Sequence, residues 1–225
     1  MKWQEKSRYE RDFKKVEDRF PKLRNDYDSK TKQWIITGDL DICDTAGDYW
    51  GTFKIKMFVP QSYPHCVPRV QELSNIVPRH ADWHIDDNGF CCLDIEHRLY
   101  ALSRKGIVLD QFISEKVYSF FANQLYKLRN GQYAGEEYKH NFDGVVQFYQ
   151  EDLNLIPELA VTFLGKILDG TIKRNILCPC GSKKKVKYCH WPSVQFLKSM
   201  NTARLIIDRF ELLQNFESNK EIPAK

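Results

Sequence analysis

The sequence contains no long hydrophobic run. No stretch of the 225 residues approaches the roughly 20 consecutive apolar residues that a helix needs to span a bilayer. The amino-terminal segment MKWQEKSRYERDFKK is rich in charged residues and lacks the apolar core of a secretory signal peptide. We therefore expect a cytoplasmic protein with no membrane partner.

A strong net charge is also lacking. The chain has 34 Lys and Arg residues against 30 Asp and Glu, a formal net charge of only +4. This excess does not by itself indicate nucleic acid as a partner, and we expect none. Hydrophobic residues make up 42% of the chain, which is typical of a globular protein. The length predicts one main domain with a small appendage.

The cysteines do not fit a disulfide framework, because there are seven of them and three lie within CPCGSKKKVKYCH. This segment supplies three thiols and one imidazole, a ligand set typical of tetrahedral zinc. Since four protein ligands close the coordination shell, we expect a structural zinc. The lysines between the ligands either contact phosphate or an acidic partner protein, or form a solvated loop. The predicted ligands are Cys178, Cys180, Cys189 and His190.

The stretch RNILCPCGSKKKVKYCH resembles the SEC-C zinc motif, first known from the tail of the bacterial secretion ATPase SecA. One departure is Lys183, which stands where the family usually has a second glycine. All four ligand positions are retained. The resemblance implies a small zinc module.

Hydrophobic periodicity predicts an α+β fold for the rest of the chain. Residues 3–20 have the spacing of an amphipathic helix that stops at a proline, and residues 23–70 read as an antiparallel meander. Four prolines then favour an irregular loop over residues 60–89. Helical stripes follow at residues 109–128, 157–168 and 193–216.

Two adjacent cysteines in GFCCLDI suggest a reactive thiol. Neighbouring residues of an extended segment point to opposite sides, so Cys91 and Cys92 cannot both face the core. The flanking apolar residues favour Cys92 as the outward one. The alternative is that each is a buried small hydrophobe, the commonest state of an unpaired cysteine.

The order of helix, meander, VPQSYPHCVPRV and WHIDDNGFCCLDI resembles the ubiquitin-conjugating enzymes. Gly89, Cys92 and Leu93 fall on that family's Gly-x-Ile-Cys-Leu pattern, whereas Val67 replaces one of its prolines and the usual Trp and Ser-Pro after the active site are absent. The resemblance implies a ubiquitin-conjugating-enzyme-like fold. It also implies that Cys92 carries the C-terminal carboxyl group of a partner protein as a thioester, which a lysine of an acceptor protein then attacks.

Three residues near Cys92 are candidates for roles in the same reaction. His84 stands eight residues earlier, where the family has an asparagine, and an imidazole N–H can also donate to the oxyanion of the thioester. The alternative is a surface histidine without a role. Asp94 and His97 could orient or deprotonate the incoming lysine, or be a strand-end carboxylate and an exposed loop residue.

The segment GEEYKHNFDG is weakly similar to stand-alone conjugating-enzyme-like proteins of bacterial antiphage (CBASS) operons. This implies that the partner is the C-terminus of a CD-NTase-class cyclic-nucleotide synthase, and that His140 is either a second functional histidine or a structural one. Two alternatives stay open, a noncatalytic binding module of the same fold and a zinc-dependent adaptor. The expected domains are a catalytic domain at 1–152, a helical connector at 153–175, the zinc module at 176–192, and an amphipathic helix and tail at 193–225.

Overall fold

The computed structural model describes residues 3–134 and 141–220. Contacts within the chain define two compact units, Met1–Glu137 and Tyr138–Lys225. The helix α5 (Asn141–Glu151) contacts other helices of the second unit, although the predicted catalytic domain extends to residue 152. We describe each unit by itself.

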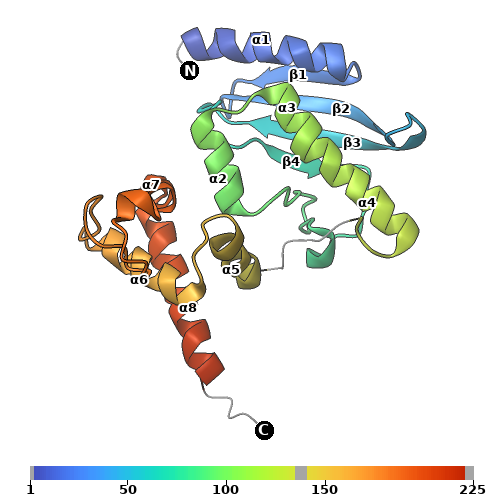
Figure 1. Ribbon diagram of the computed structural model, residues 1–225. Coiled ribbons are helices and arrows are strands. Elements are labelled where there is room, and N and C mark those ends of the chain that lie inside the picture. The colour runs from blue at the N-terminus through green and yellow to red at the C-terminus, as the bar shows by residue number, and fades with distance from the viewer. Residues whose placement is uncertain (1–2, 135–140, 221–225) are drawn as a thin grey trace. The chain divides into compact units, whose positions relative to one another are not determined.

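The first unit is an α+β structure built on a four-stranded antiparallel sheet, as predicted. The four strands lie in the sheet in their chain order, so every neighbouring pair is joined by a simple turn or loop. The helix α1 (Trp3–Arg19) precedes the sheet and ends just before Pro21 (Figure 1). The strands are β1 (Leu23–Asp28), β2 (Gln33–Cys43), β3 (Tyr49–Val59) and β4 (Arg69–Glu72).

Strand β3 shows why the sheet has one buried face. Phe53, Ile55 and Met57 are fully buried, whereas the lysines between them point to the other side of the pleat. The predicted alternation is therefore confirmed. At the end of β2 the register shifts at Cys43, whose N–H and C=O are satisfied by the Tyr118 hydroxyl at 2.7 Å and 2.8 Å.

One long helix covers the sheet (Figure 1). It consists of α3 (Leu109–Phe112), a π-helical segment η2 (Ile113–Tyr118) and α4 (Ser119–Asn130), and it ends at Gly131 with a φ of 77°. Phe121 stacks on Phe53 of β3 with ring centroids 4.4 Å apart. Two elements before this helix were not predicted, a short 3-10 turn η1 (Ala81–Trp83) and the helix α2 (Glu96–Lys105).

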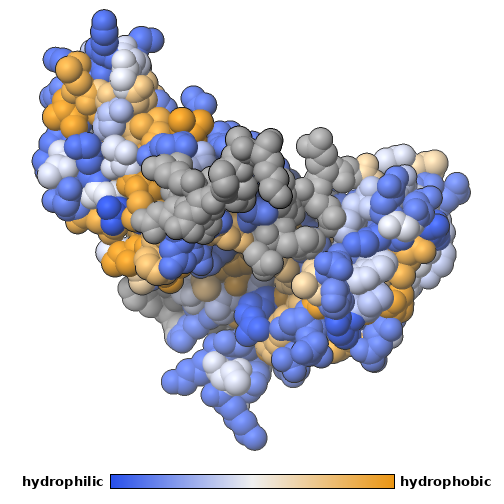
Figure 2. All heavy atoms as spheres, turned by 90° about the horizontal axis from the view of Figure 1, so that it is seen from below, coloured by the Kyte–Doolittle hydropathy of each residue, from blue (hydrophilic) through white to orange (hydrophobic). Residues whose placement is uncertain are grey.

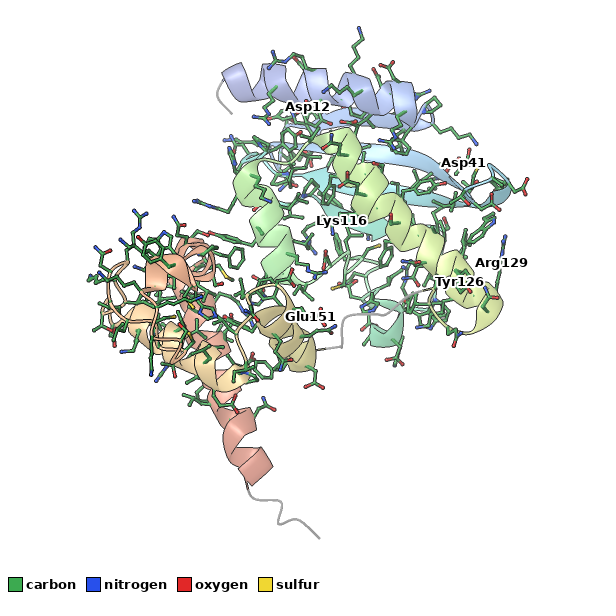
Figure 3. The ribbon with its side chains drawn as sticks, viewed as in Figure 1. Asp12, Asp41, Lys116, Tyr126, Arg129 and Glu151 are labelled. Carbon is green, nitrogen blue, oxygen red and sulfur yellow. The ribbon has the colours of Figure 1, made fainter. Side chains whose placement is uncertain are left out.

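The far end of the long helix holds the start of β3. Arg129, labelled with Tyr126 in Figure 3, donates to the Trp50 carbonyl at 2.8 Å and lies 4.8 Å from the centre of its ring. The Tyr126 ring is 6.5 Å from the same indole. These contacts fix the carboxyl end of the helix against the start of β3.

The second unit is helical around the cysteine-rich segment. The expected helix at 193–216 is two helices, because Met200 is extended and Asn201 caps a new helix by accepting a hydrogen bond from the Ala203 N–H at 2.8 Å. The buried Asp208 accepts hydrogen bonds from Tyr149 and Arg204 at 2.8 Å and 2.7 Å, which ties α5 to the last helix. The remaining elements are α6 (Pro157–Leu168), the 3-10 turn η3 (Val186–Tyr188), α7 (Trp191–Ser199) and α8 (Thr202–Lys220).

The surface mixes hydrophilic and hydrophobic residues on the face seen in Figure 2. Among the described side chains of the second unit, the most exposed large apolar ones are Tyr188 at 71% and Leu177 at 67%. Within residues 3–134 and 141–220, no helix has the length and apolar character needed to cross a membrane.

Candidate functional sites: a cysteine hairpin and a metal centre

The segment before the two cysteines is a tight hairpin. Asp86 organises it, because its Oδ1 accepts from the N–H groups of Asn88 and Phe90 at 2.9 Å and 2.8 Å. Gly89 has a φ of 84°, and a Cβ at this position would lie 2.7 Å from the Glu72 carbonyl oxygen. The turn therefore requires glycine.

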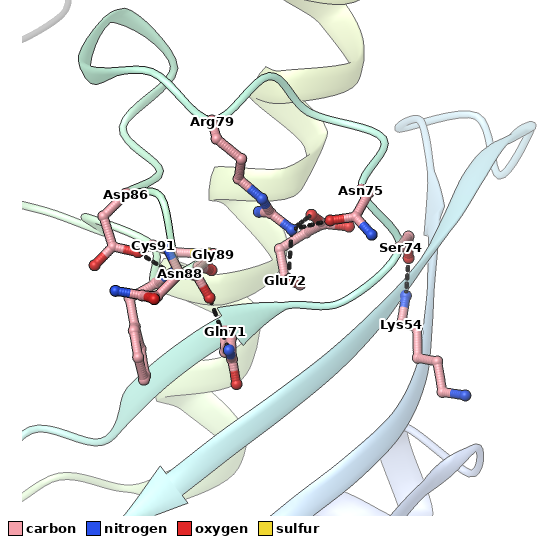
Figure 4. Close-up of polar contacts among 11 residues, drawn as sticks. Lys54, Gln71, Glu72, Ser74, Asn75, Arg79, Asp86, Asn88, Gly89 and Cys91 are labelled. Atoms are coloured by element: carbon pink, nitrogen blue, oxygen red, sulfur yellow. Dashed lines mark hydrogen bonds and ion pairs between the residues drawn. The ribbon is translucent and has the colours of Figure 1, made fainter.

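A buried ion pair supports this hairpin (Figure 4). The Arg79 guanidinium pairs with Glu72 Oε2 at 2.7 Å and donates to the Asn75 side chain at 2.7 Å. It also donates to the Glu72 carbonyl at 2.9 Å, while the Glu72 N–H donates to the Gly89 carbonyl at 2.8 Å. The loop carrying the cysteines is thus fixed to the end of β4.

The two cysteines point to different environments. Cys91 donates its N–H to the Val70 carbonyl at 2.8 Å and packs against the core, and burial, with the charge of Glu72, raises the pKa of its thiol to about 12. Cys92 is exposed, with its Sγ 3.9 Å from the Asp94 carbonyl. Partial burial of its sulfur and the charge of Asp94 raise the pKa of the Cys92 thiol. The outward residue is therefore Cys92, the one the sequence favoured.

His84 lies opposite Cys92 across the hairpin. Its carbonyl oxygen accepts the Cys92 N–H at 2.8 Å. It ends the η1 turn in the left-handed conformation, with φ 52° and ψ 33°, which is uncommon for a residue other than glycine. Its imidazole lies 6.0 Å from the Tyr133 ring. Strained backbone of this kind is often found at functional sites.

Asp94 and His97 are both engaged in structural contacts or buried. The Asp94 carboxylate is only 10% exposed and pairs with Lys116 Nζ at 2.5 Å, so it is already engaged. His97 is 1% exposed within α2, not in an exposed loop. A direct role for either toward an incoming lysine stays a prediction, and the geometry favours a structural role. His140 lies outside the described residues.

The predicted zinc ligands form a cluster in the second unit. All four ligand atoms lie within 4.8 Å of one another. His190 Nδ1 is 3.3 Å from Cys178 Sγ and 3.2 Å from Cys189 Sγ, and the sulfurs of Cys180 and Cys189 are 3.5 Å apart. These separations fit the edges of a tetrahedron with metal bonds of about 2.0–2.3 Å. The donor set and its geometry therefore fit zinc.

The surroundings of the cluster orient its histidine. Because Nδ1 faces the thiols, the other ring nitrogen, Nε2, is left to contact the Asn154 carbonyl at 3.3 Å. Metal-bound histidines commonly donate their second N–H in this way. Phe163 also packs on the ring, with centroids 5.4 Å apart. The metal centre is thus joined to the α5–α6 loop and to α6.

The turn between the ligands shows the consequence of having Lys183 in place of a glycine. Gly181 has a φ of 79° and Lys183 a φ of 60°, so two positions of this turn are left-handed. A glycine would adopt the second position without strain, and lysine adopts it at a cost of about 1 kcal/mol. The turn closes through a hydrogen bond from the Cys178 N–H to the Lys184 carbonyl at 2.8 Å. The exact turn forms despite the substitution.

Comparison with known proteins supports the metal centre most directly. Residues 174–192 match the SEC-C motif, a zinc-binding type of motif. No curated protein matches the chain. Among solved structures, the yeast vps23 UEV domain in complex with a vps27 PSDP peptide is 19% identical and covers 51% of this chain and 77% of its own, with a TM-score of 0.37. So low a TM-score says nothing about function.

Sequence reasoning missed the residues that hold the turn before His84. They are Gln124 and Lys127 of α4 and Tyr133 after it, together with Lys116, the partner of Asp94. The available signal was only the polar side of an amphipathic helix. It is a weak signal, because exposed helix faces look the same in sequence.

Proposed function

We propose that the first unit is a cysteine-dependent acyltransferase of the ubiquitin-conjugating-enzyme type. Cys92 carries the C-terminal carboxyl group of a partner protein as a thioester and passes it to an amine. The observation that carries the proposal is the exposed Cys92 paired through its backbone N–H with His84 at 2.8 Å. This backbone pairing brings together the residue with the nucleophilic thiol, Cys92, and the residue whose imidazole N–H can donate a hydrogen bond, His84.

The chemistry takes two displacements at a carbonyl carbon. First, the Cys92 thiolate attacks the carbonyl of an activated C-terminus, a thioester or an acyl adenylate, and expels its thiol or AMP. Because the pKa of Cys92 is raised, the resting group is the thiol and loses its proton before attack. Second, an amine attacks the new thioester, the C–S bond breaks, and the thiolate leaves while the nitrogen releases a proton to solvent.

His84 acts in the second displacement by stabilising charge. The attack of the amine places negative charge on the thioester oxygen, and an imidazole N–H directed at that oxygen stabilises it. The left-handed backbone of His84 holds the residue at the end of the η1 turn, next to the cysteine hairpin. Removing one such donor typically lowers a rate by about 10²–10³-fold.

The partner is a protein, and we propose the C-terminus of a CD-NTase-class cyclic-nucleotide synthase in phage defence. The support is the resemblance of GEEYKHNFDG to conjugating-enzyme-like proteins of CBASS operons. The acceptor is a lysine of a second protein. The SEC-C unit, held by zinc, helps to hold one of these partners, with its exposed Leu177 and Tyr188 available for contact.

A nonreducing gel of the protein co-expressed with its operon neighbours tests this proposal. We expect a thiol-sensitive adduct that is present in the wild type and in Cys91→Ala and absent in Cys92→Ala. In His84→Ala the adduct should form while its transfer to an amine slows. If no adduct forms with any neighbour, or if it persists in Cys92→Ala, the first unit is a noncatalytic binding module.

A further inference from the structure

Three polar side chains of the long helix share one face. Lys116 lies in the π-helical segment, and Gln124 and Lys127 follow it by eight and eleven residues in α4. Gln124 and Lys127 are three residues apart and so are neighbours on the helix surface. The eleven residues from Lys116 to Lys127 are close to three full turns, which places Lys116 on the same side of the helix. We call Lys116, Gln124 and Lys127 the positioning face.

One end of the positioning face holds the chain just after Cys92. Lys116 Nζ pairs with the Asp94 carboxylate, which is 10% exposed. Asp94 Oδ1 also accepts the Ile95 N–H at 2.8 Å, so this carboxylate fixes the start of α2 as well. An ion pair this sheltered from water is costly to break from one side only. The segment that leaves Cys92 is therefore fixed to the helix (Lys116 is labelled in Figure 3).

The other end holds the turn just before His84. Gln124 Nε2 donates to the Trp83 carbonyl at 3.1 Å, and Lys127 Nζ donates to the Asp82 carbonyl at 2.6 Å. The Tyr133 hydroxyl donates to the same Asp82 carbonyl at 3.3 Å. A three-residue 3-10 turn leaves its last carbonyls without backbone partners, and these side chains supply them.

Aromatic contacts complete this arrangement. Lys127 Nζ lies 4.7 Å from the centre of the Trp83 ring and 4.0 Å from that of Tyr133, so the ammonium sits against two aromatic rings. The Tyr133 hydroxyl lies 3.2 Å from Gln124 Oε1, and the Tyr133 ring lies 6.0 Å from the His84 imidazole. The same side chains that hold the turn thus also flank the histidine.

We propose that Gln124, Lys127 and Tyr133 are positioning residues that set where the His84 imidazole lies relative to the Cys92 sulfur. This inference rests on the proposed function. By satisfying the Asp82 and Trp83 carbonyls they hold His84 in its left-handed conformation, from which its own carbonyl reaches the Cys92 N–H. Lys116 holds the other flank of Cys92, so one helix fixes both segments of the site.

The test uses the full-length, zinc-loaded protein and two measurements. The first is the NMR signal of the His84 imidazole, assigned by its loss in His84→Gln. The second is the rate at which an amine discharges the Cys92 thioester. We expect Lys127→Met and Tyr133→Phe to shift the His84 signal and to slow discharge by about 10- to 100-fold, since small misplacement of a catalytic group has effects of that size. Thioester formation should change less than discharge.

A matched control keeps the test specific. Asn123 is exposed on the same helix and next to Gln124, so Asn123→Leu should leave the His84 signal and the discharge rate unchanged. Gln124→Leu removes a buried hydrogen-bond donor and could prevent folding. In that case Lys127→Met and Tyr133→Phe still test the proposal. An unchanged His84 signal in both of those variants overturns the positioning proposal. A shifted signal in a protein whose wild type forms no thioester supports the positioning and rejects the proposed function.

Discussion

The Cys92 N–H donates to the His84 carbonyl oxygen at 2.8 Å, and this bond closes a hairpin. Between the two residues, Ile85 pairs with Cys91 and the Asp86 N–H donates to the Phe90 carbonyl at 3.0 Å. The spacing of eight residues between histidine and cysteine is therefore the length of a hairpin whose two ends meet. The geometry of the hairpin thus accounts for the eight-residue spacing between His84 and Cys92.

The two cysteines should differ in their rates of alkylation and in how these rates depend on pH. Alkylation by iodoacetamide requires the thiolate, so Cys92, whose pKa is raised, should react faster as the pH rises through and above 9. Cys91, partly buried and with a pKa of about 12, should react at least about tenfold more slowly at pH 8. Peptide mass spectrometry over a pH series measures both rates; faster alkylation of Cys91 would contradict the assignment.

Neutralising Asp94 should make Cys92 more reactive. The charge of Asp94 is the second cause of the raised pKa after burial, so Asp94→Asn should lower the pKa and leave the effect of burial in place. A lower pKa means a larger thiolate fraction at pH 8, so alkylation of Cys92 should be faster in this variant. Asp87→Asn, an exposed carboxylate in the preceding turn, is the control and should leave the rate unchanged.

Gly89 should be among the least replaceable glycines of the first unit. In Gly89→Ala the new Cβ would meet the Glu72 carbonyl at 2.7 Å and the Arg79 guanidinium at 3.0 Å, in addition to the strain of a φ of 84°. We expect a loss of about 2–4 kcal/mol in the free energy of unfolding.

Gly47→Ala provides the matched control for this measurement. Gly47 has a similar φ of 91°, but a Cβ there would have no atom within 4 Å. Its cost should be that of backbone strain alone, about 1 kcal/mol. Denaturant unfolding of both variants compares them, and equal costs would show that the close approach to Glu72 does not matter.

Removal of zinc should loosen the second unit and leave the first intact. His190 links the metal centre to the Asn154 carbonyl and packs on Phe163 of α6, so loss of the metal removes an anchor for the α5–α6 loop. Hydrogen exchange of the full chain should speed up in α6 and α7 after chelation or in Cys180→Ser. It should not change in β3. Cys66→Ser, at an exposed cysteine outside the cluster, is the control.

Lys183→Gly should stabilise the second unit. Its φ of 60° is unstrained for glycine, so the variant should gain about 0.5–1 kcal/mol in the free energy of unfolding of the zinc-loaded protein. Lys184→Gly next to it, where φ is negative, should lose a similar amount because glycine only adds freedom to the unfolded chain. A loss of stability in Lys183→Gly would show that the lysine side chain contributes more than its backbone costs.

Much of the fold could be predicted because its signals are local. The alternation of Phe53, Ile55 and Met57 with lysines indicated the buried face of a strand, and the break at Pro21 indicated where the first helix stops. The break between α7 and α8 was missed, because the apolar spacing runs on across it and only the capping by Asn201 ends the continuity. The helix α2 was missed for lack of a clear apolar stripe.

By itself, the sequence determined the four metal ligands and the opposite orientations of Cys91 and Cys92. Both depend on spacing within a short segment, where ligand types and the alternation of side chains leave little freedom. The tertiary structure decided the rest of the cysteine site. It placed Asp94 against Lys116 and buried His97, and it brought Gln124, Lys127 and Tyr133 to the turn before His84. These contacts join residues tens of positions apart, and no local pattern encodes such pairs, because they form only when the long helix packs across the sheet.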